Sequence, residues 1–344
     1  MRRLAATLAA VALAAAACGT AGPDTVRLLA HDSFLISDEA RAAFTAATGL
    51  QLEVLPAGDA GSMVNQAILA AGNPVADVLF GVDTTFLSRA LEADLFLAYE
   101  SPALAGVLPG LDADPEHRVT PIDYGDVCLN YDKAAFTAIP PPQDLADLAA
   151  PAYGGMLVVE DPATSSPGLA FLLATIATFG EEGGYTWRDY WADLRANNVE
   201  VAASWVGAYY GAFSGGSGNG DRSLVVSYAS SPPAEVINAD PPVSEAPTGV
   251  VPAGCFRQVE FAGILRGTPH EAAARALIDF MLTEEFQEDV PLNMFVFPAL
   301  AAASLPPEFT AHTQAPTAPL TMDPALIEAN RERWIQEWAS IVLR

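Results

Sequence analysis

Basic residues, cysteines and histidines are scarce in this sequence of 344 residues, and each shortage excludes a class of function. Lysine and arginine together number 16 against 42 aspartates and glutamates, which gives a formal net charge of −26. A surface of that sign repels nucleic acid and anionic lipid, so we expect no nucleic-acid partner. The three cysteines and four histidines form no ligand-spaced cluster, so we expect neither a metal site nor a cofactor.

Motifs of known catalytic machinery are also missing. The sequence contains no Gly-x-Ser-x-Gly elbow, no phosphate-binding Walker loop and no zinc motif. Carboxylates are plentiful, but nothing in the sequence pairs two of them for acid–base chemistry. A binding protein is therefore favoured over an enzyme.

Long apolar runs are absent except at the N-terminus. There a basic start precedes an Ala-rich run over 4–17, which is typical of a signal peptide and short for a membrane span. Cys18 follows this run and resembles the lipidated cysteine of a bacterial lipobox, although Ala15 stands where Leu is usual. We expect residues 1–18 to be a signal peptide and residues 19–25 a tether to a lipid on Cys18 at the outer face of the membrane. Plain cleavage to a periplasmic or secreted protein is the alternative.

Export leaves two further cysteines, Cys128 and Cys255, in an oxidising compartment. An even pair in such a compartment usually forms a disulfide. Two buried free thiols are the alternative.

Polar side chains follow several predicted strands near the point where each strand ends. Apolar strand candidates at 26–30, 51–55 and 77–81 alternate with helical patterns, which predicts a parallel α/β sheet. In such sheets, residues just past the strand ends face a ligand crevice. The residues in this position are His31, Asp32, Asp59 and Asp83.

A hydroxyl-rich turn organises the middle of the chain. The stretch 161–168 links an apolar strand to a helical run and contains Ser165, Ser166 and Pro167. Hydroxyls at this place cap a helix, and a helix N-terminus can also hold a polar or anionic ligand group. A capped helix without a ligand is the alternative. The stretch 228–232 repeats the pattern after a second apolar strand.

Together these strings resemble one family, the thiamine-binding substrate-binding proteins of ABC importers, which are exported and often lipid-anchored. The resemblance covers residues 26–344. It rests on the strings at 31–34, 76–83, 123–125, 131–133, 161–168, 227–232 and 331–338, together with Trp205.

The resemblance implies the type II periplasmic-binding-protein fold. In that α/β fold each of two lobes has a central mixed β-sheet flanked by helices, and the ligand cleft lies between the lobes. We expect lobe 1 to comprise 26–123 and about 257–300, and lobe 2 to comprise 124–256 and about 301–344, with crossing strands near Tyr124 and Arg257. The implied function is capture of thiamine or its phosphate esters by hinge closure, as a monomer that delivers its ligand to ABC permease subunits.

The family's ligand contacts fall on a defined set of residues in this sequence. They are Asp59, Ala60, Ser165, Ser166, Trp205, Tyr228, Ala229, Ser230, Ser231 and Phe295, with His31, Asp32 and Asp126 as further candidates. Aromatic faces suit the thiazolium cation and the flat pyrimidine, and a carboxylate such as Asp59 suits the charge or the amino group. The sequence departs from the family at His31, where Tyr is frequent, at Asp126, where an aromatic is frequent, and at Phe295, which replaces Trp.

Other ligands and activities stay open at this level. A ferric-iron protein of the same fold would use Tyr209 and Tyr210 as phenolate ligands. Another small cation or a pyrimidine would also be compatible with His31, Asp126 and Phe295, the three positions at which the sequence departs from the family. From a different class, an exported hydrolase acting on the phosphorylated vitamin would need a nucleophile–base pair, which the sequence does not display.

Overall fold

The computed structural model describes residues 25–344. The predicted signal peptide, the lipid site at Cys18 and nearly all of the predicted tether lie outside the described residues.

In the described part of the chain, ten strands form one open sheet. The order of its main path is β2-β1-β3-β9-β5-β8-β6-β7, while β10 pairs with β5 and β4 pairs with β9. The strands are β1 (Thr25–Ala30), β2 (Gln51–Pro56), β3 (Val78–Asp83), β4 (Phe96–Leu97), β5 (Thr120–Asp132), β6 (Leu157–Glu160), β7 (Glu200–Ala202), β8 (Leu224–Tyr228), β9 (Thr248–Leu265) and β10 (Phe297–Pro298).

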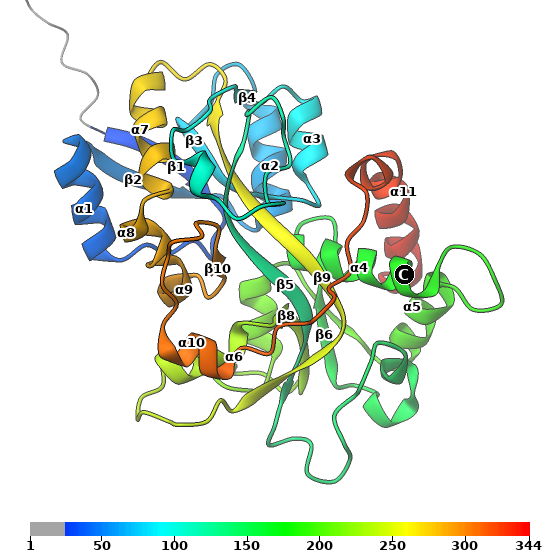
Figure 1. Ribbon diagram of the computed structural model, residues 1–344. Coiled ribbons are helices and arrows are strands. Elements are labelled where there is room, and N and C mark those ends of the chain that lie inside the picture. Colours follow the sequence, from blue (N-terminus) through cyan, green and yellow to red (C-terminus); the bar gives the residue numbers. More distant parts are fainter. Residues whose placement is uncertain (1–24) are drawn as a thin grey trace, which may run out of the picture.

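Helices cover this sheet (Figure 1). The α-helices are α1 (Asp38–Thr48), α2 (Ala60–Leu69), α3 (Leu87–Glu92), α4 (Ser166–Phe179), α5 (Trp187–Ala196), α6 (Ser231–Ile237), α7 (Glu271–Met281), α8 (Glu284–Gln287), α9 (Val290–Asn293), α10 (Pro307–His312) and α11 (Pro324–Val342). Short 3₁₀ turns η1 (Leu104–Gly106), η2 (Ala146–Ala149) and η3 (Pro151–Tyr153) and a π-helical turn η4 (Gly207–Ala212) complete the set.

Two long strands connect the two lobes. β5 and β9 pair antiparallel along most of their length and run diagonally through the molecule, with β1 to β4 beside one end and β6 to β8 beside the other (Figure 1). Within each lobe the outer strands are parallel, as in β1 with β2 and β3 and in β6 with β7 and β8. The mixed sheets, the flanking helices and the crossing strands are those of the two-lobed α/β fold expected from the sequence.

Aromatic side chains fill the second lobe beneath its helices. Trp191 of α5 and Trp338 of α11 are buried, with ring centroids 5.6 Å apart in an edge-to-face arrangement. Trp187 and Trp334, on the same two helices, are buried as well. These four tryptophans belong to the core, because burying large aromatic faces is a strong contribution to packing. The C-terminal helix α11 is thereby held against α5.

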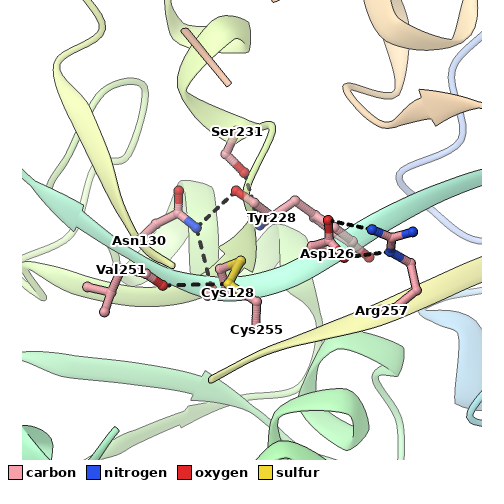
Figure 2. Close-up of a disulfide and its surroundings, with 8 residues drawn as sticks. All are labelled: Asp126, Cys128, Asn130, Tyr228, Ser231, Val251, Cys255 and Arg257. Atoms are coloured by element: carbon pink, nitrogen blue, oxygen red, sulfur yellow. Dashed lines mark hydrogen bonds and ion pairs between the residues drawn. A yellow bond between two sulfur atoms is a disulfide. The ribbon is translucent and has the colours of Figure 1, made fainter. Parts of the chain in front are cut away.

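A disulfide joins the two crossing strands, between Cys128 of β5 and Cys255 of β9 (Figure 2). Both residues are buried, and their Cα atoms are 4.4 Å apart. The pairing of the two strands shifts at this point, since Val127 opposes Phe256 but Leu129 opposes Val251. The disulfide therefore holds together the strands at an irregularity of the ladder.

Candidate functional site

A cleft between the lobes is the candidate site. It has about 650 Å³ of empty space, a volume that includes space open to solvent. Its lining comes from both lobes and consists of His31, Ser33, Asp59, Ala60, Ser166, Pro167, Trp205, Tyr209, Tyr210, Tyr228, Ser231, Ala234, Glu260, Met294, Phe295 and Val296.

The structure brings most of the sequence-predicted residues to this cleft. Those that line it are His31, Asp59, Ala60, Ser166, Trp205, Tyr228, Ser231 and Phe295. Those outside its lining are Asp32, Asp126, Ser165, Ala229 and Ser230. Ser165, Ala229 and Ser230 are fully buried behind the surface of the cleft, whereas Asp32 is exposed to solvent.

Asp126 lies on the crossing strands and not in the cleft lining. Its carboxylate accepts two hydrogen bonds from the guanidinium of Arg257, with Nε 2.6 Å from Oδ1 (Figure 2). The guanidinium carbon also lies 5.0 Å from the ring centroid of Tyr124. The acid that the sequence suggested for the cleft is thus neutralised within the β5–β9 ladder.

Asp59 connects the two lobes. It is the N-cap of α2, and its Oδ1 accepts a hydrogen bond of 2.7 Å from the N–H of Ala60. Its Oδ2 accepts a second bond of 2.9 Å from the N–H of Trp205 in the other lobe. Burial raises the pKa of the Asp59 carboxyl, while these N–H donors act in the opposite direction.

A second set of backbone contacts closes the lobes beside Asp59. The N–H groups of Gly61 and Ser62, at the start of α2, donate to the carbonyl oxygen of Thr164 at 2.9 and 3.3 Å. Gly61 permits this approach, because a Cβ atom there would lie 2.9 Å from backbone atoms of Ala163 and Thr164. The structure therefore shows the lobes in contact at this edge of the cleft.

Three aromatic rings form one wall of the cleft. Trp205 stacks on Tyr209 with centroids 5.1 Å apart, and Tyr210 meets Trp205 edge-on. The two tyrosines belong to η4. A π-helical turn inserts an additional residue per turn and often marks a functional site. The indole N–H of Trp205 donates to Ser227 Oγ at 2.9 Å, which fixes the orientation of the ring.

A chain of hydrogen bonds supports the two hydroxyl-rich turns beside the cleft. The hydroxyl of Tyr228 donates to Gln258 Oε1 at 3.2 Å, and Gln258 Nε2 donates to Ser166 Oγ at 2.9 Å. Ser231 Oγ accepts from the N–H of Tyr228 at 3.1 Å. These bonds hold the two hydroxyl-rich turns in one arrangement around the cleft.

The expected hydroxyl cap of α4 is not formed. Ser165 occupies the N-cap position, but its side chain makes no capping hydrogen bond, and its Oγ has no partner in the described part of the protein. Pro167 is the second helical residue. The turn serves the cleft through Ser166 and Pro167 instead.

Glu260 is the main cleft residue that the sequence did not reveal. It lies in the interior of β9, and only 8% of its surface is exposed. Its Oε1 is 3.5 Å from Nε2 of His31. Burial, together with the neighbouring Asp123, raises the pKa of the Glu260 carboxyl well above its ordinary value. No motif marks this position, because a single Glu in a strand has no sequence signature.

Comparison with known proteins agrees with this geometry. Residues 73–318 match the family of bacterial extracellular solute-binding proteins. The chain belongs to that family. It is 30% identical to the thiamine-binding periplasmic protein of Escherichia coli K12, over 88% of this chain and 87% of that one. A protein of the same name from Brucella suis is 26% identical over 93% of each chain.

Solved structures show the same architecture. A periplasmic thiamin binding protein superposes with a TM-score of 0.82 at 27% identity, covering 93% of this chain and 96% of that one. Iron-bound HitA from Pseudomonas aeruginosa superposes with a TM-score of 0.70 at 20% identity, covering 93% of this chain and 99% of that one, which shows the fold alone. This solute-binding protein is thus an extracytoplasmic carrier and not an enzyme, as the sequence predicts. Among its described residues, no helix is long and apolar enough to cross a membrane.

Proposed function

We propose that this solute-binding protein captures thiamine in the cleft and presents it to an ABC importer. The observation that carries the proposal is the juxtaposition of the stacked Trp205 and Tyr209 with two acids, Asp59 and Glu260, in one partly enclosed space. Aromatic faces attract a thiazolium cation and a flat pyrimidine. The two carboxyls provide the complementary negative charge.

The ferric-iron alternative has less support in the geometry. The hydroxyl of Tyr209 donates to Glu235 Oε1 at 2.8 Å, and burial raises the pKa of Tyr209 well above its ordinary value. A phenolate ligand needs the opposite shift. Among residues 25–344, no group of three His, Cys, Asp or Glu side chains is arranged to hold a metal ion.

The transport cycle follows from the contacts between the lobes. Separation of Asp59 from the N–H of Trp205 would open the cleft, and ligand binding would favour the closed state. We propose a monomer whose lobes are 26–123 with about 257–300 and 124–256 with about 301–344. A lipid on Cys18 would keep it beside the permease subunits at the outer face of the membrane.

Isothermal titration of the exported chain, from Gly19 onward, with thiamine tests the ligand. One-to-one binding would support the proposal, and its absence in a folded protein would overturn it. Ferric citrate, added in a parallel titration, tests the iron alternative through the visible absorbance of a tyrosinate–iron complex.

Removal of an aromatic anchor is expected to weaken binding. The variants Trp205→Ala and Tyr228→Ala should each lower thiamine affinity by about 1–3 kcal/mol, the scale of a lost aromatic contact. Titration calorimetry measures the change, and Tyr185→Ala, at an exposed position on the surface, serves as a control. Unchanged affinity in both cleft variants would exclude these rings from the site.

A further inference from the structure

The C-terminal helix α11 contacts both lobes. In lobe 2, Trp338 of α11 packs edge-to-face on Trp191 of α5, with ring centroids 5.6 Å apart. Against lobe 1, α11 meets the short helix α3 (Figure 1), where Nη1 of Arg89 donates to Oε1 of Glu332 at 3.0 Å. We call this the α3–α11 contact. A movement of lobe 1 away from α5 and α11 must break it.

Arg331 is a buried charge within the α3–α11 contact, since only 4% of its side chain is exposed. Its Nη1 donates to Ser88 Oγ of α3 at 3.2 Å, and its guanidinium carbon lies 6.0 Å from the ring centroid of Phe86. Its Nε has no hydrogen-bond partner among residues 25–344. The carboxylate of Glu332 is 3.7 Å from Nε and belongs to a side chain that is largely exposed. Burying a charge with so few partners costs free energy.

Phe86 connects the α3–α11 contact to the edge of the cleft. Its ring is buried, and a Cβ atom on Gly61 would lie 2.8 Å from its Cζ. Gly61 is the residue whose N–H donates to the carbonyl oxygen of Thr164 in lobe 2. The surface of lobe 1 that carries Gly61 and Phe86 therefore meets lobe 2 at two adjacent places, Thr164 and Arg331. We expect opening of the cleft to expose the guanidinium of Arg331 to water.

Like charges also face each other across the α3–α11 contact. Glu92 of α3 shares a hydrogen bond with Glu328 of α11, which raises the pKa of Glu328. Burial lowers the pKa of Arg331, and the neighbouring Arg89 acts in the same direction, against Glu332. The ion pair between Arg89 and Glu332 is partly exposed on both sides, and such pairs contribute little stability. The contact as a whole therefore offers little to offset the burial of Arg331.

We propose that Arg331 opposes closure of the cleft, so that a bound ligand must supply the free energy that buries its guanidinium. This inference rests on the proposed function for the choice of ligand. Interaction energy that is spent on closure is lost from the apparent affinity of the ligand. Arg331 thus lowers the affinity and keeps closure reversible, as a carrier that must release its ligand to a permease requires.

The test replaces Arg331 by Met, which keeps an unbranched apolar chain against Phe86 and removes the charge. No buried carboxylate loses its partner, because Glu332 is largely exposed and keeps its bond to Arg89. We expect Arg331→Met to bind thiamine about tenfold more tightly in titration calorimetry, since less binding energy is spent on closure. In small-angle X-ray scattering, unliganded Arg331→Met should have a smaller radius of gyration than the unliganded wild type.

Two variants control for effects other than closure. Arg266→Met also removes one positive charge, but this guanidinium bonds to Asp94 and to the carbonyl oxygen of Phe96 within lobe 1. Its thiamine affinity should stay close to that of the wild type, because salt screens an exposed charge. Arg331→Lys keeps a charge at the same position and should bind thiamine no more tightly than the wild type. Tighter binding by Arg331→Lys would contradict the inference, whether or not Arg331→Met folds.

The outcomes separate this inference from the function that it rests on. Unchanged affinity and unchanged scattering in a folded Arg331→Met would overturn it, because the α3–α11 contact would then persist when the cleft opens. Weaker binding would overturn it as well, since Arg331 would then favour closure. If neither the wild type nor the variant binds thiamine, the proposed ligand is wrong. The scattering of the two unliganded proteins then still decides whether Arg331 opposes closure.

Discussion

Replacement of Asp59 by Asn is expected to weaken thiamine binding by about 2–5 kcal/mol, the cost of removing one partner of a buried, hydrogen-bonded charge pair. Asn has one acceptor oxygen where Asp59 uses two, so the substitution removes the negative charge and also one of the two hydrogen bonds, from the N–H of Ala60 or from that of Trp205. Burial raises the pKa of Asp59, which means that the charge destabilises the empty protein. Removal of the buried charge stabilises the unliganded variant and loss of one hydrogen bond destabilises it, so we expect its thermal stability to change little while its affinity falls. Quenching of Trp205 fluorescence or calorimetry gives the affinity.

Glu160 provides a matched control for Asp59. It is also buried, its carboxyl oxygens have no hydrogen-bond donor among residues 25–344, and its pKa is raised well above the ordinary value by burial and by Asp59. Glu160 does not line the cleft, so Glu160→Gln should leave thiamine affinity close to that of the wild type. Equal losses of thiamine affinity in Asp59→Asn and Glu160→Gln would mean that Asp59 acts through the general electrostatic field of the cleft and not as the direct partner of the cation.

Much of the fold could be predicted from local patterns. The strand β1, which ends just before His31, and the strand β3, which ends at Asp83, are short and apolar and are followed by helical periodicity, which is the signature of a parallel α/β lobe. The crossing of β5 and β9 is a matter of long-range pairing, which composition and periodicity do not encode. Its expected position near Tyr124 and Arg257 came from the family resemblance.

The candidate site could be predicted in part, for the same reason. Residues at or just past strand ends, such as Tyr228 and Asp59, have a position that the sequence order suggests. Asp126 and Glu260 lie within strands, and their environment depends on which strand lies next to them. In the strand register, Asp126 lies opposite Arg257, whereas Glu260 lies opposite two further acids, Asp83 and Asp123. The sequence therefore singled out Asp126 in the β5–β9 ladder, whereas the carboxylate of that ladder that lines the cleft is Glu260.

Loss of the disulfide between Cys128 and Cys255 is expected to have the largest effect on stability. The two residues are 127 positions apart in the sequence, and the chain-entropy relation for a loop of that length gives about 5 kcal/mol of the free energy of unfolding. We expect the double variant Cys128→Ala/Cys255→Ala to unfold at a clearly lower urea concentration than the oxidised wild type. Mass measurement under non-reducing conditions first establishes that the bond is present.

Reduction of the wild type is the control for this variant, because it breaks the bond without removing sulfur atoms from the core. Reductant should shift the urea midpoint of the wild type towards that of the double variant and leave the variant unchanged. Equal midpoints for oxidised and reduced wild type would contradict a stabilising role.

The effect of reduction on thiamine affinity separates two ways in which the disulfide could act. Cys128 pairs with Ser227 of β8. Tyr228 and Ser231 follow Ser227 in the chain and lie close to the disulfide (Figure 2). If reduction lowers stability alone, the bond restrains the unfolded chain; if it also lowers affinity, the bond positions that turn at the cleft.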